Sequence, residues 1–421
     1  MKREIFLGIT AFGLVLGFYD GYLVFSELPE RKNSFINEDL VAPNNILAVT
    51  EKRGDSFLYL DDIGTPIIRE NLLENKKITL TNNATNIKEN KIAFPLGTTT
   101  ITWNLFNNNE KIATVNQKIT VVENPLYTKT NQNNKRIMID FDDGYSSVYN
   151  LGLPILDRYD IKTSQYIICG NVRDFQTGYM SWDNIRAMKE SGHSIQSHSM
   201  SHLNADSLSE QQIHDEYGQP VMDCFAKNGI EGIKMVSFPL AIGWDDPKII
   251  NIIDDIYEFA RGSSTNNVFP TCCDKSFIDL GQKNCATYTS EKENELNFFN
   301  RYNILGWKHD ARQAELEFDE VQMFLEFIKF VNSATKNTDN ETIEIPIVVY
   351  HRVVKDNTST NPKFQGVSTD LLEAEMKYLD DNNFEIYTAN DLDYDAKNNW
   401  IIIKPQIIFV INFVLQIIRV L

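Results

Sequence analysis

The residues that could do chemistry gather in two short segments. One is Asp140-Phe-Asp-Asp-Gly-Tyr, which places Asp140, Asp142 and Asp143 within four residues, and the other carries His198 and His202, four residues apart. Carboxylates this close repel one another unless a cation or a proton relieves them. Two histidines four residues apart on one helical turn can share a metal. Each pattern alone also has an ordinary explanation, since Asp-Asp-Gly is common in surface turns.

A metal centre would join the two segments. Asp143, His198 and His202 would supply three ligands and leave a position open for water, as in catalytic zinc sites. Zinc can lower the pKa of its water to about 7. Asp142, beside the ligand, could then take the proton, and His351 could protonate the leaving group. The sequence therefore predicts a hydrolytic metal site.

The elements that must position these residues alternate between strand and helix. They follow a polar segment, 126–135, that we interpret as a linker, and they continue to residue 395. Seven or eight such units in about 260 residues favour a distorted (β/α) barrel, with an open doubly wound sheet as the alternative. The expected strands are 136–141, 164–169, 194–197, 233–238, 257–261, 302–307, 344–350 and 384–388.

Four of the six histidines, His193, His198, His202 and His351, fall at or beside the ends of expected strands. Active sites of (β/α) barrels gather at the carboxyl ends of the strands, so this placement favours the metal site. We expect His193 to be a packed residue or a neighbour of the ligands, not a ligand itself.

These segments resemble motifs of the polysaccharide deacetylase family, the NodB-like carbohydrate esterases. The family's T-F-D-D-G is similar to residues 140–144, with Asp140 in place of Thr, and its H-[ST]-x-x-H matches residues 198–202 in full. Ile345-Pro-Ile-Val-Val-Tyr-His-Arg-Val resembles its last motif. The resemblance implies Asp142 as the base, His351 as the general acid, and Asp143, His198 and His202 as metal ligands.

The third motif of the family, an R-x-P-Y-G-like turn, is only partly present at residues 237–244. Its arginine and tyrosine are missing, and Arg261 or Arg301 could replace the arginine. Residues 307–310 (Trp-Lys-His-Asp) resemble the fourth motif weakly. From the resemblance we expect substrate contacts at Tyr145, Pro239 and Trp244.

The resemblance implies a metal-dependent deacetylase that removes N-acetyl groups from a cell-surface or extracellular polysaccharide, with zinc as the expected metal. Two alternatives stay open: a metal-dependent hydrolase of another non-peptide C–N amide bond, and a catalytically silent glycan-binding surface protein. The formal net charge of −18 and the lack of a Lys/Arg-rich run argue against nucleic acid as a partner.

The remaining segments predict export. Residues 1–30 begin Met-Lys-Arg and continue in an apolar run, which is typical of a signal peptide or membrane anchor, although a buried N-terminal helix is the alternative. We therefore expect an extracytoplasmic protein that is membrane-anchored or secreted. Residues 396–421 form an apolar tail, either a terminal core element or a second membrane contact.

Residues 31–125 contain short β-rich runs between Asn/Gly/Asp turns, which favours a small β-sandwich. Phe94-Pro-Leu-Gly-Thr-Thr and the following strand resemble the hyalin-repeat type of immunoglobulin-like module. Five cysteines are too few for a disulfide scaffold, although Cys272 or Cys273 could close a loop to Cys285.

Overall fold

The computed structural model of the 421-residue chain has two compact units, a small one within the first 118 residues and a large one that contains residues 119–421. The structure describes residues 14–19, 22–27, 40–53, 55–69, 72, 77–84, 87–88, 91–125, 135–172, 178–243, 246–264, 271–273, 300–302, 304–332, 342–355, 366–395 and 400–403.

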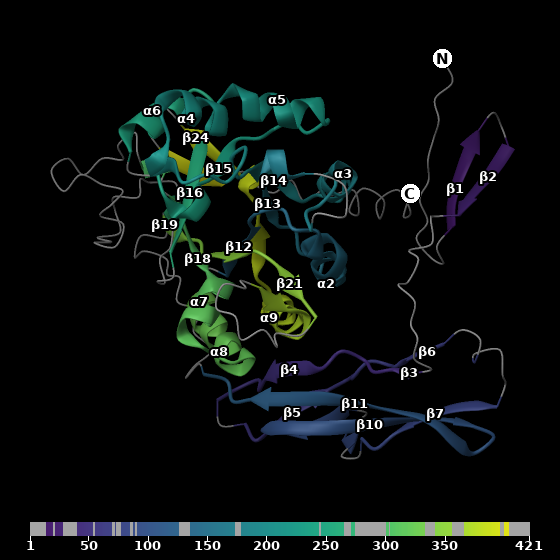
Figure 1. Cartoon of the computed structure of the whole chain (residues 1–421). Coiled ribbons are helices and arrows are strands. Elements are labelled where there is room, and N and C mark those ends of the chain that lie inside the picture. The colour runs from purple at the N-terminus through teal and green to yellow at the C-terminus, as the bar shows by residue number, and fades with distance from the viewer. Residues whose placement is uncertain are drawn as a thin grey trace, which may run out of the picture. The chain divides into compact units, whose positions relative to one another are not determined.

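Seven parallel strands of the large unit close into a barrel (Figure 1). An eighth strand, β23 (Glu385–Tyr387), pairs with the first half of β12, whose second half pairs with β13. The predicted distorted barrel of seven to eight units is therefore confirmed, and the open doubly wound sheet is wrong. The seven strands, in their order around the barrel, are β12 (Arg136–Phe141), β13 (Ser164–Ile167), β14 (Ser194–Ser197), β15 (Met235–Ser237), β16 (Phe259–Ser264), β18 (Ile304–Lys308) and β20 (Ile347–Tyr350).

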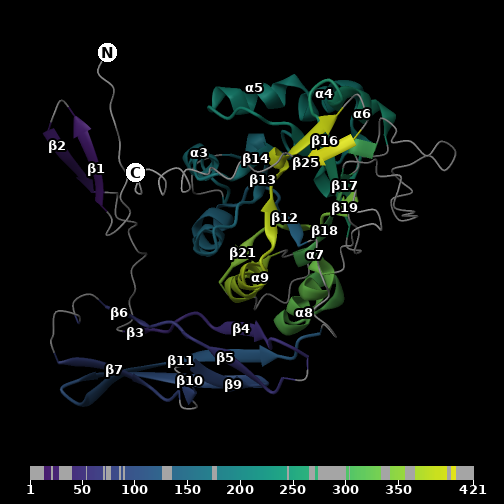
Figure 2. The same ribbon diagram turned by 180° about the vertical axis from the view of Figure 1, so that it is seen from behind.

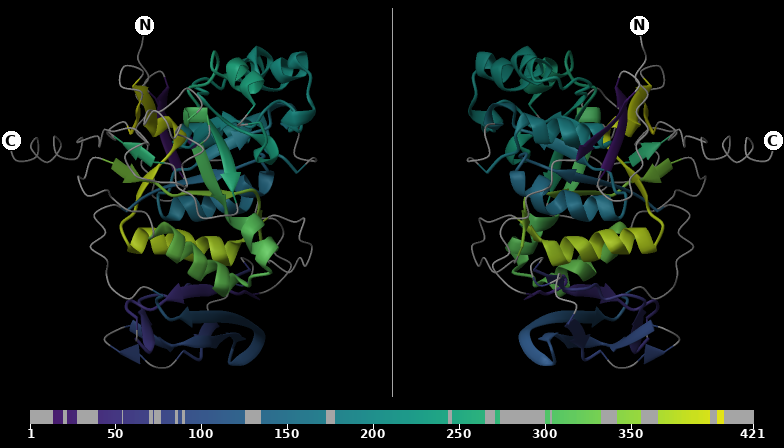
Figure 3. Two further views of the ribbon diagram at one scale, coloured as in Figure 1. Left: turned by 90° about the vertical axis from the view of Figure 1, so that its left-hand side faces the viewer. Right: turned by 90° about the vertical axis from the view of Figure 1, so that its right-hand side faces the viewer.

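Helices surround this barrel (Figure 2), and α8 and α9 pack side by side (Figure 3). They are α2 (Leu153–Arg158), α3 (Trp182–Glu190), α4 (Glu210–Tyr217), α5 (Gln219–Lys227), α6 (Pro247–Ile253), α7 (His309–Leu316), α8 (Glu320–Val331) and α9 (Thr369–Asp381).

The helical sequence patterns of residues 210–228 and 314–332 each form two helices in the structure. The first breaks at Gly218, where a Cβ would lie 2.4 Å from the carbonyl oxygen of His214, and Pro220 follows with no backbone N–H to extend helix α4. In the second, α7 ends at Glu317 with a left-handed φ of 52°, and Asp319 caps α8.

Side chains on β12 alternate between the barrel interior and the helix layer. Ile137, Ile139 and Phe141 join the apolar cluster that includes the helices, whereas Met138 lies in the cluster inside the barrel. Because successive side chains of a strand point to opposite faces, Asp140 and Asp142 continue the inward row of Met138. The interior of the barrel thus becomes polar towards the carboxyl end of β12.

The strands between residues 40 and 122 form three sheets, in the orders β4-β11-β10-β7, β5-β9-β8 and β3-β6. The short β-rich runs that we expected here are present as strands. The immunoglobulin-like, hyalin-repeat sandwich and the domain boundaries stay predictions. The strands are β3 (Leu40–Val41), β4 (Ile46–Val49), β5 (Phe57–Leu60), β6 (Ile67–Ile68), β7 (Ile78–Asn82), β8 (Ile87–Lys88), β9 (Lys91–Pro95), β10 (Gly97–Asn107) and β11 (Glu110–Val122).

The remaining described strands form short pairs. Near the N-terminus, β1 (Leu14–Tyr19) and β2 (Tyr22–Glu27) form an antiparallel hairpin. At the start of the predicted tail, β25 (Trp400–Ile403) pairs with β24 (Leu392–Asp395). Among the described residues, no helix has both the length and the apolarity needed to cross a membrane. The other pairs are β17 (Thr271–Cys273) with β19 (Thr342–Glu344) and β21 (Val353–Val354) with β22 (Val367–Ser368).

Cys169 and Cys224 form a disulfide, which the sequence did not lead us to expect. Cys169 follows β13, and Cys224 lies on α5. The pairing that we considered for Cys285 lies outside the described residues.

Candidate active site

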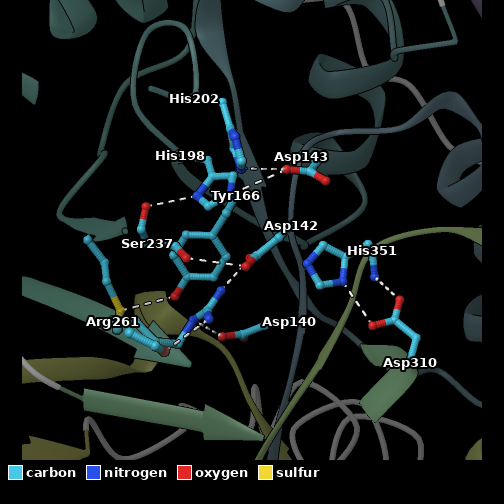
Figure 4. Close-up of polar contacts among 12 residues, drawn as sticks. Asp140, Asp142, Asp143, Tyr166, His198, His202, Ser237, Arg261, Asp310 and His351 are labelled. Atoms are coloured by element: carbon cyan, nitrogen blue, oxygen red, sulfur yellow. Dashed lines mark hydrogen bonds and ion pairs between the residues drawn. The ribbon is translucent and has the colours of Figure 1, made fainter. Parts of the chain in front are cut away.

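The Asp-Asp-Gly segment turns sharply at the carboxyl end of β12. Asp143 and Gly144 both have left-handed backbones, with φ of 72° and 77°. Aspartate tolerates this region better than most residues, and a Cβ at Gly144 would lie 3.1 Å from Ile167. The turn leaves Asp142 facing inward below Asp143, and Asp143 faces the two histidines (Figure 4).

His198 and His202 lie on a loop that follows β14, not on a helical turn as we expected. The loop reverses at Ser199 and at His202, with φ of 66° and 60°, so an α-helix cannot form there. The four-residue spacing still brings the two rings together, because both Nε2 atoms lie 3.4 Å from Oδ1 of Asp143. The predicted grouping is therefore confirmed, although the helical reason for it is wrong.

Glu216, a buried residue of α4 that sequence reasoning missed, holds this loop. Its carboxylate accepts hydrogen bonds from Ser199 Oγ at 3.1 Å and from the backbone N–H of Ser201 at 2.8 Å. Ser199 Oγ in turn accepts the backbone N–H of His202 at 3.0 Å. Glu216 lies well beyond the His198–His202 motif in the sequence and belongs to no motif of its own. Its role is therefore visible only in the folded structure.

The three side chains fit a tetrahedral metal ion. Ligand atoms about 2.0–2.1 Å from a tetrahedral metal lie about 3.3–3.4 Å from one another, close to the two distances found here. His198 Nδ1 lies 2.8 Å from the carbonyl oxygen of Ser237 and donates its proton there, which leaves Nε2 free to bind a metal. Asp143, His198 and His202 form a candidate metal centre whose ligand atoms all lie within 4.8 Å of one another.

Asp142 lies beside this centre and is held ionised. Burial alone would raise its pKa, but the Arg261 guanidinium, with His198 and His351, lowers the pKa below its ordinary value. Arg261 Nη2 donates to Oδ1 of Asp142, and Ser237 Oγ donates to Oδ2 at 3.3 Å. A carboxylate that stays charged near a metal site is suited to accept a proton.

Of the two arginines considered for the missing arginine of the third motif, Arg261 contacts Asp142 and Arg301 does not. Arg261 is fully buried on β16, where its guanidinium lies 4.4 Å from the ring centroid of Tyr166 and its Nε lies 2.9 Å from Oδ2 of Asp140. Arg301 pairs instead with Asp254, at 2.5 Å.

Asp140, which stands where the family has Thr, is fully buried and pairs with Arg261. Burial raises its pKa to about 7, although the charge of Arg261 opposes the rise. Asp140 is therefore an interior partner of the arginine, not a solvent-facing residue.

His351 faces the site from the end of β20 and is held by Asp310. Its Nδ1 lies 2.9 Å from Oδ1 of Asp310, and its backbone N–H donates to Oδ2 at 2.8 Å. Burial alone would lower the pKa of His351, but Asp310, with Asp142 and Asp143, raises it to about 9. His351 is therefore protonated at neutral pH, as a general acid requires. Asp310, in the weakly matching fourth motif, is the partner that fixes it.

The three predicted substrate contacts differ in what the structure describes. Tyr145 is half-buried, stacks on Tyr179 at 5.0 Å between centroids, and has the Arg352 guanidinium 3.9 Å from its ring centroid. Pro239 is buried at the start of the loop after β15. Trp244 lies outside the described residues. All three roles stay predictions.

His193 is a packed residue, as we expected, and lies far from the chemistry. It precedes β14, at the amino end of the strand, whereas His198 follows the carboxyl end. Its Nδ1 accepts the backbone N–H of Thr163 at 3.1 Å, and burial lowers its pKa to about 4.

Residues 129–239 match the polysaccharide deacetylase family model. The Bacillus subtilis (strain 168) protein YxkH, which carries the name of a polysaccharide deacetylase, is 30% identical over 82 residues, or 20% of this chain and 29% of YxkH. The chain therefore covers less than a third of the length of this curated relative.

Among solved structures, the peptidoglycan deacetylase PdaC of Bacillus subtilis is 14% identical, with a TM-score of 0.36 over 62% of this chain and 90% of PdaC. The Xyl-CE4 domain of a multidomain xylanase from the hindgut metagenome of Trinervitermes trinervoides is 16% identical, with a TM-score of 0.37 over 61% of this chain and 88% of that domain. At TM-scores this low neither likeness supports a conclusion, so the barrel rests on its own strand pairing.

The segment matched by the family model contains the turn after β12 and the loop after β14, which together hold Asp142 and all three candidate metal ligands. This segment of the chain is therefore similar to polysaccharide deacetylases.

Proposed function

We propose that this domain is a metal-dependent deacetylase that hydrolyses N-acetyl groups of a cell-surface or extracellular polysaccharide. One observation carries the proposal: Asp142, with a lowered pKa, lies beside the Asp143–His198–His202 group, and His351, with a raised pKa, faces the same site. An ionised base and a protonated acid at neutral pH are what amide hydrolysis needs.

Asp143, His198 and His202 would hold the metal, and we propose Zn²⁺ because one carboxylate and two imidazoles are ordinary zinc ligands. When bound, zinc would polarise the acetyl carbonyl and lower the pKa of a water molecule. The hydrogen bond from His198 Nδ1 to Ser237 keeps the ring oriented for this role.

The side chains around the metal centre would move the protons. Asp142 accepts a proton from the attacking water while Arg261 keeps the carboxylate oriented. The C–N bond of the acetamide then breaks, and His351 gives its proton to the departing amine, so the products are acetate and a free amino sugar. Asp310 stabilises the charged form of His351 before the transfer.

The glycan would bind at the rim of the site. We propose Tyr145 as a sugar contact because it follows Gly144 directly and presents an aromatic ring beside Tyr179. Sugar rings commonly pack on aromatic faces, whose apolar area offers large burial at small entropic cost.

We also propose that the domain works outside the cytoplasm, tethered or secreted through residues 1–30. The Cys169–Cys224 disulfide supports this placement, because disulfides persist in oxidising compartments and are rare in the cytosol. The acidic balance of the chain disfavours nucleic acid as a partner.

Three variants of the full chain test the assignment: Asp142→Asn, His351→Gln and, as a control, His193→Gln at the opposite end of β14. Acetate release from N-acetylglucosamine oligomers should fall about 10²–10⁴-fold in the first two variants and stay close to the unmodified protein in the third. Equal activity in all three proteins would refute the assigned roles. Binding of the oligomers without any acetate release would favour a silent glycan-binding protein.

A further inference from the structure

A buried glutamate on helix α9 joins the two residues that precede the acid pair. Oε1 of Glu375 lies 2.7 Å from Nε2 of His309, and Oε2 accepts the hydroxyl proton of Tyr350 at 2.7 Å. All three residues are fully buried. His309 directly precedes Asp310, and Tyr350 directly precedes His351.

Glu375 links β18 and β20 at the point where their backbone hydrogen bonds end. The ladder between β18 and β20 stops at the pair Lys308–Val349, because α7 begins at the next residue. One position beyond this pair, Glu375 links the ends of the two strands through the side chains of His309 and Tyr350. A clamp on the side chains of His309 and Tyr350 therefore sets the separation of the two backbones that continue directly into Asp310 and His351.

The same clamp reaches the base. The carbonyl oxygen of Tyr350 accepts the backbone N–H of Asp142 at 2.9 Å. A shift of Tyr350 would therefore move Asp142 and His351 together.

We propose that Glu375 is a positioning residue that holds the Asp310–His351 pair and its distance to Asp142 through paired hydrogen bonds to His309 and Tyr350. The kinetic consequences of this inference rest on the deacetylase function proposed above. The positioning of His351 by Glu375 does not depend on that function. The glutamate touches neither Asp310 nor His351, so it acts only through their neighbours.

The pKa of His351 depends on the charged groups that surround it. Asp310 faces it from α7, and Asp142 and Asp143 face it from the turn after β12. Lys308 ends the neighbouring strand. Because the bond to Asp310 raises the pKa of His351 more than the other charges do, loss of the 2.9 Å contact lowers that pKa.

Two substitutions of Glu375 separate positioning from charge. Glu375→Met keeps most of the volume but loses both hydrogen bonds, whereas Glu375→Gln loses the charge but can keep both bonds. Asp380→Met, at an exposed position of the same helix, is the matched control. Tyr350→Phe removes one bond alone, which keeps the test possible if Glu375→Met does not fold.

The readout is the pKa of His351, followed by NMR of the full chain labelled at its histidines, together with the pH profile of acetate release. In Glu375→Met the pKa should fall by about one unit or more, and kcat should fall about ten- to hundredfold with an alkaline limb shifted to lower pH. Tyr350→Phe should change both values in the same direction by less. Glu375→Gln and Asp380→Met should match the unmodified protein.

An unchanged His351 pKa in folded Glu375→Met, or in Tyr350→Phe if the first does not fold, would overturn the proposal. Equal losses in Glu375→Met and Glu375→Gln would also overturn it, because charge alone would then explain them. If the unmodified chain releases no acetate but the NMR shifts appear, the positioning role stands and the deacetylase function fails.

Discussion

Asp310→Asn gives the sharpest expectation for the acid side of the site. The substitution keeps the size of the side chain but removes the negative charge that lies 2.9 Å from Nδ1 of His351. Without that charge, burial dominates, and the pKa of His351 should fall from about 9 to below the ordinary value of 6.5. At pH 7.5 the protonated fraction of His351 would then drop about thirtyfold if the pKa falls to about 6.

Because the reaction needs the protonated form, activity should decline as pH rises through the pKa of His351. We expect the alkaline limb of kcat/KM near pH 9 in the unmodified protein and about 2.5–3 units lower in Asp310→Asn, with the loss largely recovered at low pH. The measurement is acetate release from N-acetylglucosamine oligomers between pH 5 and pH 10. An alkaline limb at the same pH in both proteins would refute the assignment of His351 as the acid.

Three further expectations concern the base, the metal loop and the disulfide. Arg261→Met should leave Asp142 as a buried carboxylate without its cationic partner, so the acidic limb of the pH profile should move to higher pH. The free energy of unfolding, measured by urea denaturation, should fall by about 3–5 kcal/mol. An acidic limb at the same pH would contradict the role of the arginine. Glu216→Ala should weaken zinc affinity about 10–100-fold in a chelator competition. Unaltered affinity would show that the loop keeps its conformation without Glu216. Cys224→Ser should lower the free energy of unfolding by about 4 kcal/mol or less, because the disulfide joins residues 55 apart, and no loss would show that the bridge to Cys169 is absent in solution.

The barrel could be predicted because its strands follow simple patterns. All eight expected strands exist, and short apolar runs separated by helical periodicity mark them plainly. The divided helices were harder, because Gly218 and Glu317 interrupt patterns that otherwise continue across them. Local backbone geometry, not the apolar pattern, decides such breaks.

The residues of the candidate site could be identified in the sequence, but several of the residues that hold them in place could not. Asp142, Asp143, His198 and His202 stand in motifs that the sequence displays. Glu216 contacts the histidine loop only in the folded protein, and its spacing from the histidines in the sequence gives no sign of this contact. Supports of this kind come from helices of the outer layer, whose side chains meet the site only after the barrel closes.

Arg261 shows an intermediate case. The sequence left it as one of two candidates for the missing arginine of the third motif, and only the fold separates it from Arg301. The choice follows from alternation on β16, because Phe259 and Arg261 share the inward face. Asp140 then has a buried cation beside it, which explains how a carboxylate is tolerated in the interior.

The most direct test of the central claim is acetate release from N-acetylglucosamine oligomers by the purified full chain, before and after a chelator and again after added zinc. We expect release that stops with the chelator, returns with zinc, and does not return in Asp143→Asn. Release that persists in the chelated protein, or that survives Asp143→Asn unchanged, would contradict a metal-dependent deacetylase at this site.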